Sequence, residues 1–348
     1  MTVLATVFVR CGVRLEAPSF LQCRAWGARG VRGFRQKNPR PPQEVPKEKL
    51  SRGPSVQLEE AGVEVGGQGW AVLLRPAAFT VAFSGAALGS CAVWQYENMR
   101  SAALKSRVQG MWGEVWGGQK KRGEWREQVR EWWAAQGEAA RLFWPLAGLN
   151  LLVWCCWRVP ALQATMVKYF LANPYSRHNC LPLLLSTFSH HSVVHLAANM
   201  FVLHSFMDTG VHLLGREQFL GVYLSAGVTS SFFSMVYKVA ARRSSHSLGA
   251  SGAICAVLGM FATLLPQAQL QLIFLPGLTF SAATGLKAMM ASDAAGCVLG
   301  WRFFDHAAHL SGLLLGVGWC YLGNPLVWER REGLVTAWHN IRDSNRRD

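Results

Sequence analysis

Long apolar stretches without charged residues dominate the chain after about residue 140. No Asp, Glu, Lys or Arg occurs from His178 to Met207, or from Ser244 to Leu286. A helix of a soluble protein needs a polar face, whereas a helix crossing a bilayer core of about 30 Å needs roughly 20 apolar residues. The pattern therefore predicts an all-α, polytopic membrane protein.

The apolar runs predict one isolated span, followed by six that lie close together in the sequence. The isolated span covers residues 76–96, and a polar connector rich in tryptophan covers 97–141. Tryptophan is typical of a membrane interface, so we expect an amphipathic connector. The six further spans are expected at about Leu142–Ala161, Thr187–Met207, Gln218–Tyr237, Gly249–Leu265, Leu270–Met290 and Ala307–Leu322. We expect this 1+6 arrangement to comprise a six-helix core over 142–323 and a C-terminal tail over 324–348.

The region before the first span is strongly basic. Glu16 is the single acidic residue among the first 43, which contain many arginines. An arginine-rich and acid-poor composition is typical of a mitochondrial transit peptide, and a basic disordered tail is the alternative. We assign residues 1–50 to this segment and 51–75 to a linker without a core of its own.

The composition of the chain indicates which kinds of partner surround it. The chain is 51% hydrophobic and 16% charged, against about 25% charged in a typical soluble domain. The net charge of +15 would suit nucleic acid, but the basic residues lie in the N-terminal region and in loops flanking apolar spans. There they act as orientation signals, so we expect a lipid bilayer around the protein and no nucleic-acid partner.

The loop charges predict the orientation of the spans. Short loops on the side opposite the N-terminus contain a single basic residue, Arg216, whereas those on its own side contain Arg158, Lys168, Arg177, Lys238, Arg242, Arg243 and Arg302. The positive side is the inner side of a membrane. In a mitochondrial inner membrane, the N-terminus would therefore lie in the matrix and the C-terminus in the intermembrane space.

Polar residues inside apolar spans are costly and mark candidate sites. His195 and Asn199 lie four apart and share one helix face. His191 and His195 also have a metal-like spacing, but the zinc-protease motif needs Glu where this chain has Ser192, so we predict no metal and no cofactor. Hydrogen bonds to a neighbouring helix would explain His195 and Asn199 equally well.

Two further spans begin with small residues and one chemically active side chain each. Ser251 lies between Gly249 and Gly252, where the backbone can approach a substrate carbonyl. His309 precedes Gly312 and Gly316, a small-xxx-small pattern typical of tightly packed membrane helices. Close packing and a structural histidine are the alternative interpretations.

The three spans carrying these motifs begin on the same membrane face, because they alternate with the spans between them. Ser251, His309, His195 and Asn199 can therefore meet at one depth. Acyl transfer needs a nucleophile, a base and oxyanion donors in this arrangement. We predict a Ser–His dyad, with no acidic residue placed as a third member and Asp305 at the membrane interface.

Three phrases make the chain similar to the rhomboid intramembrane serine proteases, and to their mitochondrial branch in particular. They are Leu185-Ser186-Thr187-Phe188-Ser189-His190, Ser247-Leu248-Gly249-Ala250-Ser251-Gly252-Ala253 and Phe304-Asp305-His306-Ala307-Ala308-His309. The resemblance covers about residues 76–340. It implies a serine endopeptidase of the mitochondrial inner membrane that cleaves single-pass transmembrane proteins in regulated intramembrane proteolysis, with roles in mitochondrial quality control and cell death.

The resemblance also implies a role for each matched residue. Ser251 matches the nucleophile and His309 the general base, while His195 and Asn199 match the oxyanion donors together with the Ser251 N–H. Segment 157–184 resembles the family's interfacial first loop and begins with its Trp-Arg pair. Ser311 departs from the glycine that is common there.

Two other classes remain open at this point. A catalytically silent scaffold of the same fold would bind transmembrane clients. A transporter or proton relay would use the intramembrane histidines with an acidic partner, for which Asp293 is the candidate.

Overall fold

The computed structural model describes residues 7–8, 69–112, 125–272, 275 and 277–344, with the side chains of 7–8 and 108–112 excluded. The chain divides into two units, one formed by residues 1–10 with 63–348 and the other by 11–62. The second unit lies outside the described residues, as do most of the predicted transit segment and linker. Trp116 of the predicted connector also lies outside them.

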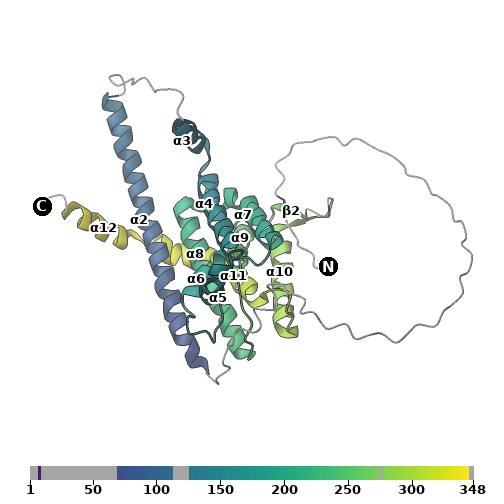
Figure 1. Cartoon of the computed structure of the whole chain (residues 1–348). Coiled ribbons are helices and arrows are strands. Elements are labelled where there is room, and N and C mark those ends of the chain that lie inside the picture. Colours follow the sequence, from purple (N-terminus) through teal and green to yellow (C-terminus); the bar gives the residue numbers. More distant parts are fainter. Residues whose placement is uncertain (1–6, 9–68, 113–124, 273–274, 276, 345–348) are drawn as a thin grey trace, which may run out of the picture. The chain divides into compact units, whose positions relative to one another are not determined.

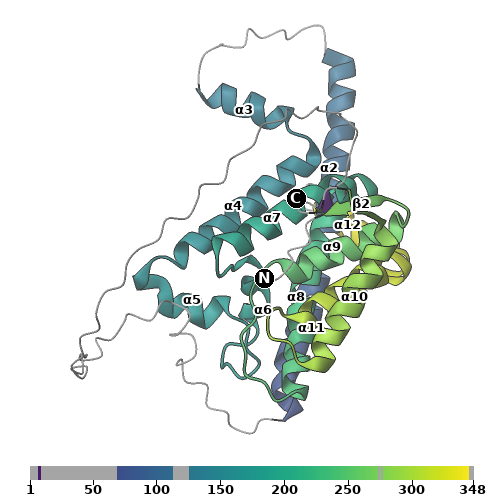
Figure 2. The ribbon, with the colours of Figure 1, turned by 90° about the vertical axis from the view of Figure 1, so that its right-hand side faces the viewer.

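Helices make up most of the described residues (Figures 1 and 2). They are η1 Trp70–Leu73, α2 Leu74–Trp112, α3 Trp125–Ala135, α4 Glu138–Cys156, η2 Pro160–Leu162, α5 Gln163–Phe170, α6 Leu181–Leu185, η3 Ser186–Phe188, α7 Val193–Leu214, α8 Arg216–Ala240, α9 Ser251–Leu264, α10 Ala282–Leu299, α11 His306–Gly318, the π-helical segment η4 Trp319–Trp328, and α12 Glu332–Ser344. The all-α class is confirmed. The long helices α2, α4 and α7–α11 are compatible with the 1+6 arrangement.

Several of these helices have the length and apolar character of membrane spans. Within the described residues, four helical stretches meet both conditions: Trp70–Arg107, Glu138–Cys156, Arg216–Ala240 and His306–Trp328. The shorter α9 is also apolar. The chain is therefore a membrane-embedded helical protein.

Polar residues at the helix starts explain where three helices of the core begin. Ser192 accepts a hydrogen bond from the His195 N–H at the start of α7, and Ser281 caps α10 in the same way. Asp305 caps α11 by accepting from the Ala308 N–H at 3.1 Å. Such caps satisfy backbone donors that have no partner within the helix. Ser192, which excluded the zinc motif, is thus the N-cap that places His195 in the first turn of α7.

The predicted span Leu270–Met290 is wrong in its first half. Residues Gln269–Leu272 form strand β2, which pairs antiparallel with β3, Thr279–Ser281. The short strand β1, Val7–Phe8, pairs with the other edge of β2. Alternating Gln and Leu in β2 fits the two-residue period of a strand, and Gly277 with φ +109° lies in the turn. The helix begins only at Ala282 and continues to Leu299.

Glycine contacts join the helices at the centre of the fold. A side chain at Gly312 or Gly316 of α11 would collide with the Gly252 or Ala256 carbonyl of α9. The same holds for Gly259 of α9, which lies against the α11 backbone. This seam brings the first turns of α9 and α11 to the same end of the bundle, where the predicted site residues lie.

The additional N-terminal helix α2 packs along α8 and is contacted near the middle of its length by α12 (Figure 1). Glu97 of α2 accepts a hydrogen bond from the Trp338 indole at 2.9 Å and forms an ion pair with Arg342. Tyr96 lies 2.6 Å from the His339 ring nitrogen. Much of the segment predicted as a tail is therefore a helix attached to α2.

Candidate active site

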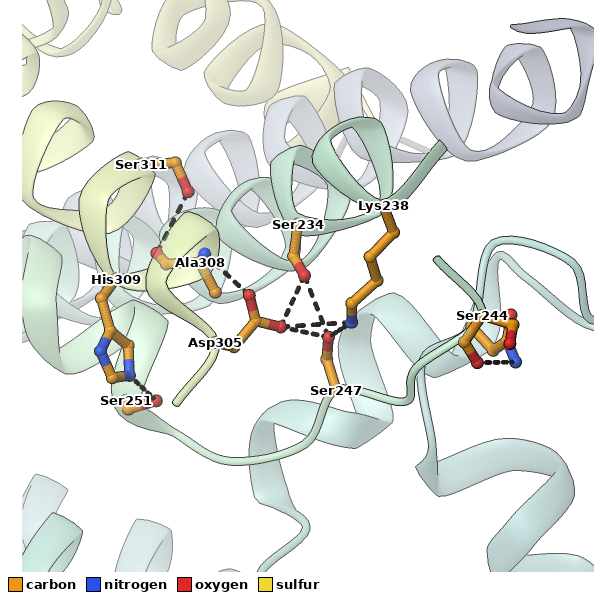
Figure 3. A network of polar contacts seen from close by, with 10 residues as sticks. Ser234, Lys238, Ser244, Ser247, Ser251, Asp305, Ala308, His309 and Ser311 are labelled. Atoms are coloured by element: carbon orange, nitrogen blue, oxygen red, sulfur yellow. Dashed lines mark hydrogen bonds and ion pairs between the residues drawn. The ribbon is translucent and has the colours of Figure 1, made fainter. Parts of the chain in front are cut away.

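Two helices present Ser251 and His309 to each other. Ser251 is the first residue of α9, and His309 is the fourth residue of α11. The His309 Nε2 lies 2.8 Å from the Ser251 Oγ, a hydrogen-bonding distance (Figure 3). The His309 side chain is 18% exposed, so the pair is sheltered but can be reached from outside. A serine beside a histidine is the arrangement that activates a hydroxyl as nucleophile.

A tight turn delivers Ser251 to the helix start. Gly249 has φ +122°, a left-handed conformation that favours glycine. Its N–H donates to the Ser186 carbonyl at 2.8 Å, which fixes the turn against the end of α6 and η3. Because Ser251 lies in the first helical turn, its own N–H has no carbonyl four residues earlier within the helix. That N–H lies at the positive end of the helix dipole, where negative charge is stabilised.

The His195 ring lies on the other side of the same turn. A Cβ built on Gly249 would lie 2.9 Å from the His195 Cε1, 3.0 Å from its Nε2 and 3.8 Å from the Ser251 Oγ. The ring and the hydroxyl therefore flank one backbone position. The buried His190 ring packs edge-to-face on His195, with ring centres 4.9 Å apart, and limits its movement.

Asn199 lies one turn further along α7 and is buried. Its Nδ2 donates to the His195 carbonyl at 2.9 Å. An amide nitrogen carries two hydrogens, so this bond engages one of them. The structure thus brings Ser251, His309 and His195 together directly, and holds the Asn199 amide against the backbone of His195.

A carboxylate that the sequence analysis considered only for a proton relay lies near the dyad. Asp293 of α10 is buried, and its Oδ1 lies 3.7 Å from the His309 Nδ1. The same oxygen lies 2.7 Å from the His306 Nδ1, which is a hydrogen bond. A separation of 3.7 Å is too long for a hydrogen bond but close enough for charge attraction. Spacing along the chain could not reveal this neighbour, because α10 contributes it from another helix.

Two residues that begin the predicted first loop hold the entry to α7. The Trp157 indole donates to the Ser189 hydroxyl at 2.7 Å, and the Arg158 guanidinium donates to the His191 carbonyl at 3.1 Å. Between them these bonds anchor the segment that leads to His195. The Trp-Arg pair therefore has a structural role beside the site.

One charged residue near the site differs from its predicted environment. Lys238, counted above as a loop charge, belongs to α8, and its side chain is only 5% exposed. It pairs at 3.3 Å with Asp305, whose side chain is 21% exposed. An Asp directly before an apolar helix is typical of an N-cap, which was the available signal for Asp305. The remaining loop charges still favour the N-terminal side.

The class of protein follows from this fold and from a comparison with known families. Residues 177–325 match the model of the Rhomboid domain, in agreement with the resemblance given by the three phrases. The chain belongs to the rhomboid family.

Within the rhomboid family, the chain is similar to several mitochondrial proteins. The chain is 50% identical over 276 residues to presenilin-associated rhomboid-like protein, mitochondrial, of Homo sapiens, covering 78% of this chain and 72% of the relative. The corresponding protein A of Danio rerio is 44% identical over 295 residues, with 78% and 76% covered. Rhomboid protein 1, mitochondrial, of Saccharomyces cerevisiae is 36% identical over 200 residues, with 56% and 57% covered. These relatives are named as mitochondrial proteins.

Proposed function

We propose that the protein is an intramembrane serine endopeptidase of the mitochondrial inner membrane that cleaves single-pass transmembrane proteins. The observation that supports this most directly is the 2.8 Å contact between the His309 Nε2 and the Ser251 Oγ. The two atoms come from α9 and α11, which pack closely through glycine residues.

The proposed mechanism gives each of these groups a role. The His309 Nε2 takes the proton of the Ser251 hydroxyl while the oxygen attacks the scissile carbonyl. The carbonyl oxygen gains negative charge, and the Ser251 N–H, the His195 ring and the Asn199 amide stabilise it.

The C–N bond breaks as His309 gives the proton to the leaving amine, which leaves an acyl group on Ser251. A water molecule then gives its proton to His309 and attacks this ester, and His309 returns the proton to the Ser251 oxygen as the acid product leaves. Asp293, 3.7 Å from the His309 Nδ1, favours the positively charged ring that exists while His309 holds the transferred proton.

Substrate preference follows from the position of the site in an apolar bundle. In a helical substrate the peptide carbonyl groups are engaged in hydrogen bonds within the helix. The helix must therefore unwind before the serine can attack one of them. We expect substrates with Gly, Pro or polar residues near the cut. With the N-terminus in the matrix, the Ser251 end of α9 faces the matrix side.

Replacement of Ser251 tests the proposal. Ser251→Ala in the full chain, reconstituted in liposomes, should abolish cleavage of a transmembrane reporter peptide and labelling by a fluorophosphonate probe. Ser205→Ala is the matched control, because Ser205 is also in an apolar helix and donates only to its own helix at 2.9 Å. Cleavage by Ser251→Ala would defeat the assignment. A wild-type protein that binds the peptide without cutting or labelling would favour the scaffold, and proton movement without labelling would favour the relay.

A further inference from the structure

A second polar cluster joins α8 to the two segments that carry the dyad, but lies outside the dyad. Ser234 and Lys238 come from α8, Ser247 lies four residues before the proposed nucleophile, and Asp305 lies four residues before the proposed base. Figure 3 shows the chain running from this cluster directly to Ser251. The mechanism proposed above does not use these four side chains.

The Asp305 carboxylate is surrounded by hydrogen-bond donors. Its Oδ2 accepts from the Ser234 hydroxyl at 2.5 Å, from the Lys238 ammonium at 3.3 Å and from the Ser247 hydroxyl. Its Oδ1 accepts from the Ala308 N–H at 3.1 Å. A protonated carboxyl would place a hydrogen against a donor, so this environment fits the ionised form. Burial alone raises the pKa of Asp305, but the Lys238 charge and the hydroxyl donors hold this pKa well below its ordinary value.

The Lys238–Ser247 contact is not a second catalytic pair. The Lys238 Nζ also donates to the Ser247 Oγ, which resembles a Ser–Lys arrangement. The Lys238 Nζ also forms an ion pair with the Asp305 carboxylate at 3.3 Å, however, and an ammonium group has no acceptor site for the Ser247 proton. Ser247 is also buried, so a substrate carbonyl has no access to it.

The cluster connects the backbone segments that determine the dyad geometry. Asp305 caps α11, and its carbonyl accepts from the His309 N–H at 3.0 Å. Ser247 exchanges two backbone hydrogen bonds with Ala172 of the first loop, at 2.9 and 3.0 Å. The side-chain contact between Ser247 and Asp305 therefore links the first turn of α11 to the segment that leads into α9.

Stability alone is a weak reason to bury such a pair. Removing a lysine and an aspartate from water is unfavourable, and well-packed apolar residues often give an equal or greater stability. A polar pair can fix the register between two segments better than an apolar contact can, because apolar contacts are not directional. A misplacement of about 1 Å at reacting atoms can cost about a hundredfold in rate.

We propose that Lys238 and Asp305 are a positioning pair that keeps Ser251 and His309 in register, acting through Ser247. This rests on the protease function proposed above. The pair touches neither the substrate nor the reacting atoms. Its effect is on the distance and direction between the serine oxygen and the histidine nitrogen.

Two variants test the pair in the full-length protein in liposomes. Ser247→Ala removes the link while keeping both charges. The double variant Lys238→Met with Asp305→Asn removes both charges together, keeps a residue that can cap α11, and leaves no unpaired ion. The matched control is Glu97→Gln with Arg342→Met, which removes an ion pair between α2 and α12, far along the chain from either catalytic residue.

The measurements are kcat and KM for the reporter peptide, the labelling rate of Ser251 by the fluorophosphonate, and the thermal unfolding midpoint. We expect both test variants to lose about tenfold to a hundredfold in kcat and labelling rate, with KM within about twofold and unfolding like the control. Lys238→Met alone should be worse than the double variant, because it leaves Asp305 unpaired.

Other results would overturn the positioning role. One such result is a kcat equal to that of the wild type in a folded Ser247→Ala variant or in the folded double variant of Lys238 and Asp305. A loss of activity that merely follows the loss of folded protein would assign the cluster to stability instead. Failure of the protease function is recognised separately, by an inactive wild type or by cleavage that persists in Ser251→Ala.

Discussion

Two helix contacts in this protein have opposite construction. At the α9–α11 seam, backbone meets backbone, because Gly312 and Gly316 lie directly against carbonyls of α9. At the α2–α8 contact, side chains fill the space: a Cβ at Gly221 would meet the Leu88 Cδ2 at 3.1 Å and the Cys91 Cβ at 3.4 Å. In lipid, both contacts depend on close packing, since lipid tails are as apolar as the helices.

The difference shows which helix contact must be positioned accurately. The α9–α11 seam carries Ser251 and His309, whose hydrogen bond tolerates an error of a few tenths of an ångström. Rigid backbone contacts leave little freedom for such an error. The α2–α8 contact carries no predicted catalytic residue, and flexible side chains there can adjust. Four sets of variants would break or sharpen this contrast.

The largest effect is expected from the same substitution at the two contacts. Gly316→Ala should greatly lower activity and the unfolding midpoint, because its Cβ would overlap the Ala256 carbonyl and the neighbouring Met260 N–H. Overpacking of this kind typically costs about 1–3 kcal/mol. Gly221→Ala should have a small effect, since Leu88 can move. Gly318→Ala, with nothing within 4 Å, is the neutral control. Similar losses at Gly316 and Gly221, measured by thermal unfolding and peptide cleavage, would refute the contrast.

The next-largest effect is expected at Gly249, where the contact of a new side chain with His195 can be distinguished from backbone strain. Gly249→Ala should lower kcat by about a hundredfold to a thousandfold, the typical cost of losing one oxyanion donor, because the new methyl group displaces the His195 ring. Gly277→Ala is the matched control: its φ of +109° is also left-handed, but nothing lies within 4 Å. Both variants should lose some stability, measured by thermal unfolding. Equal activity losses in the two would exclude the specific contact with His195.

A smaller effect is expected at the carboxylate behind His309. Asp293→Asn should reduce kcat by about tenfold, much less than the roughly ten-thousandfold loss typical of a directly hydrogen-bonded triad aspartate. The reason is the 3.7 Å separation from the His309 Nδ1. Asp208→Asn, at an exposed position of α7, is the control. A drop of several thousandfold in steady-state cleavage would show that the carboxylate closes on His309 during the reaction.

The smallest effect is expected where α12 meets α2. Glu97→Gln or Arg342→Met should leave kcat unchanged and shift the unfolding midpoint only slightly, because the two side chains are 29% and 27% exposed and exposed ion pairs contribute little. Cleavage and unfolding assays on the two single variants measure this. A strong loss of activity would mean that α2 participates in catalysis and that the two contacts differ less than proposed.

Sequence reasoning reached the helical class and the family, because these depend on charge-free runs and on local phrases around Ser251 and His309. It misjudged residues 270–272 and 279–281, which form strands, since an uncharged stretch satisfies the hydropathy criterion whether it forms a strand or a helix. There the alternation of Gln and Leu at 269–272 was the better signal.

The environments of Lys238, Asp293 and Asp305 could not be predicted in the same way. Each has a partner on another helix or loop, and one sequence shows the spacing along a helix but not the helix that faces it. Lys238 illustrates the consequence: its position near the end of an apolar run was interpreted as a loop charge. The orientation argument survives its loss because the other basic residues are in loops.

The link between α12 and α2 has a consequence for how the protein is made. Glu97 and Arg342 are 245 positions apart in sequence, so their contact can form only after nearly all of the intervening chain has been synthesised and inserted into the membrane. Until then α2 can pack on α8 but lacks its partner on the C-terminal side. Contacts between such distant segments form late in folding. The contact between α2 and α12 is therefore one of the last that a newly made chain can form.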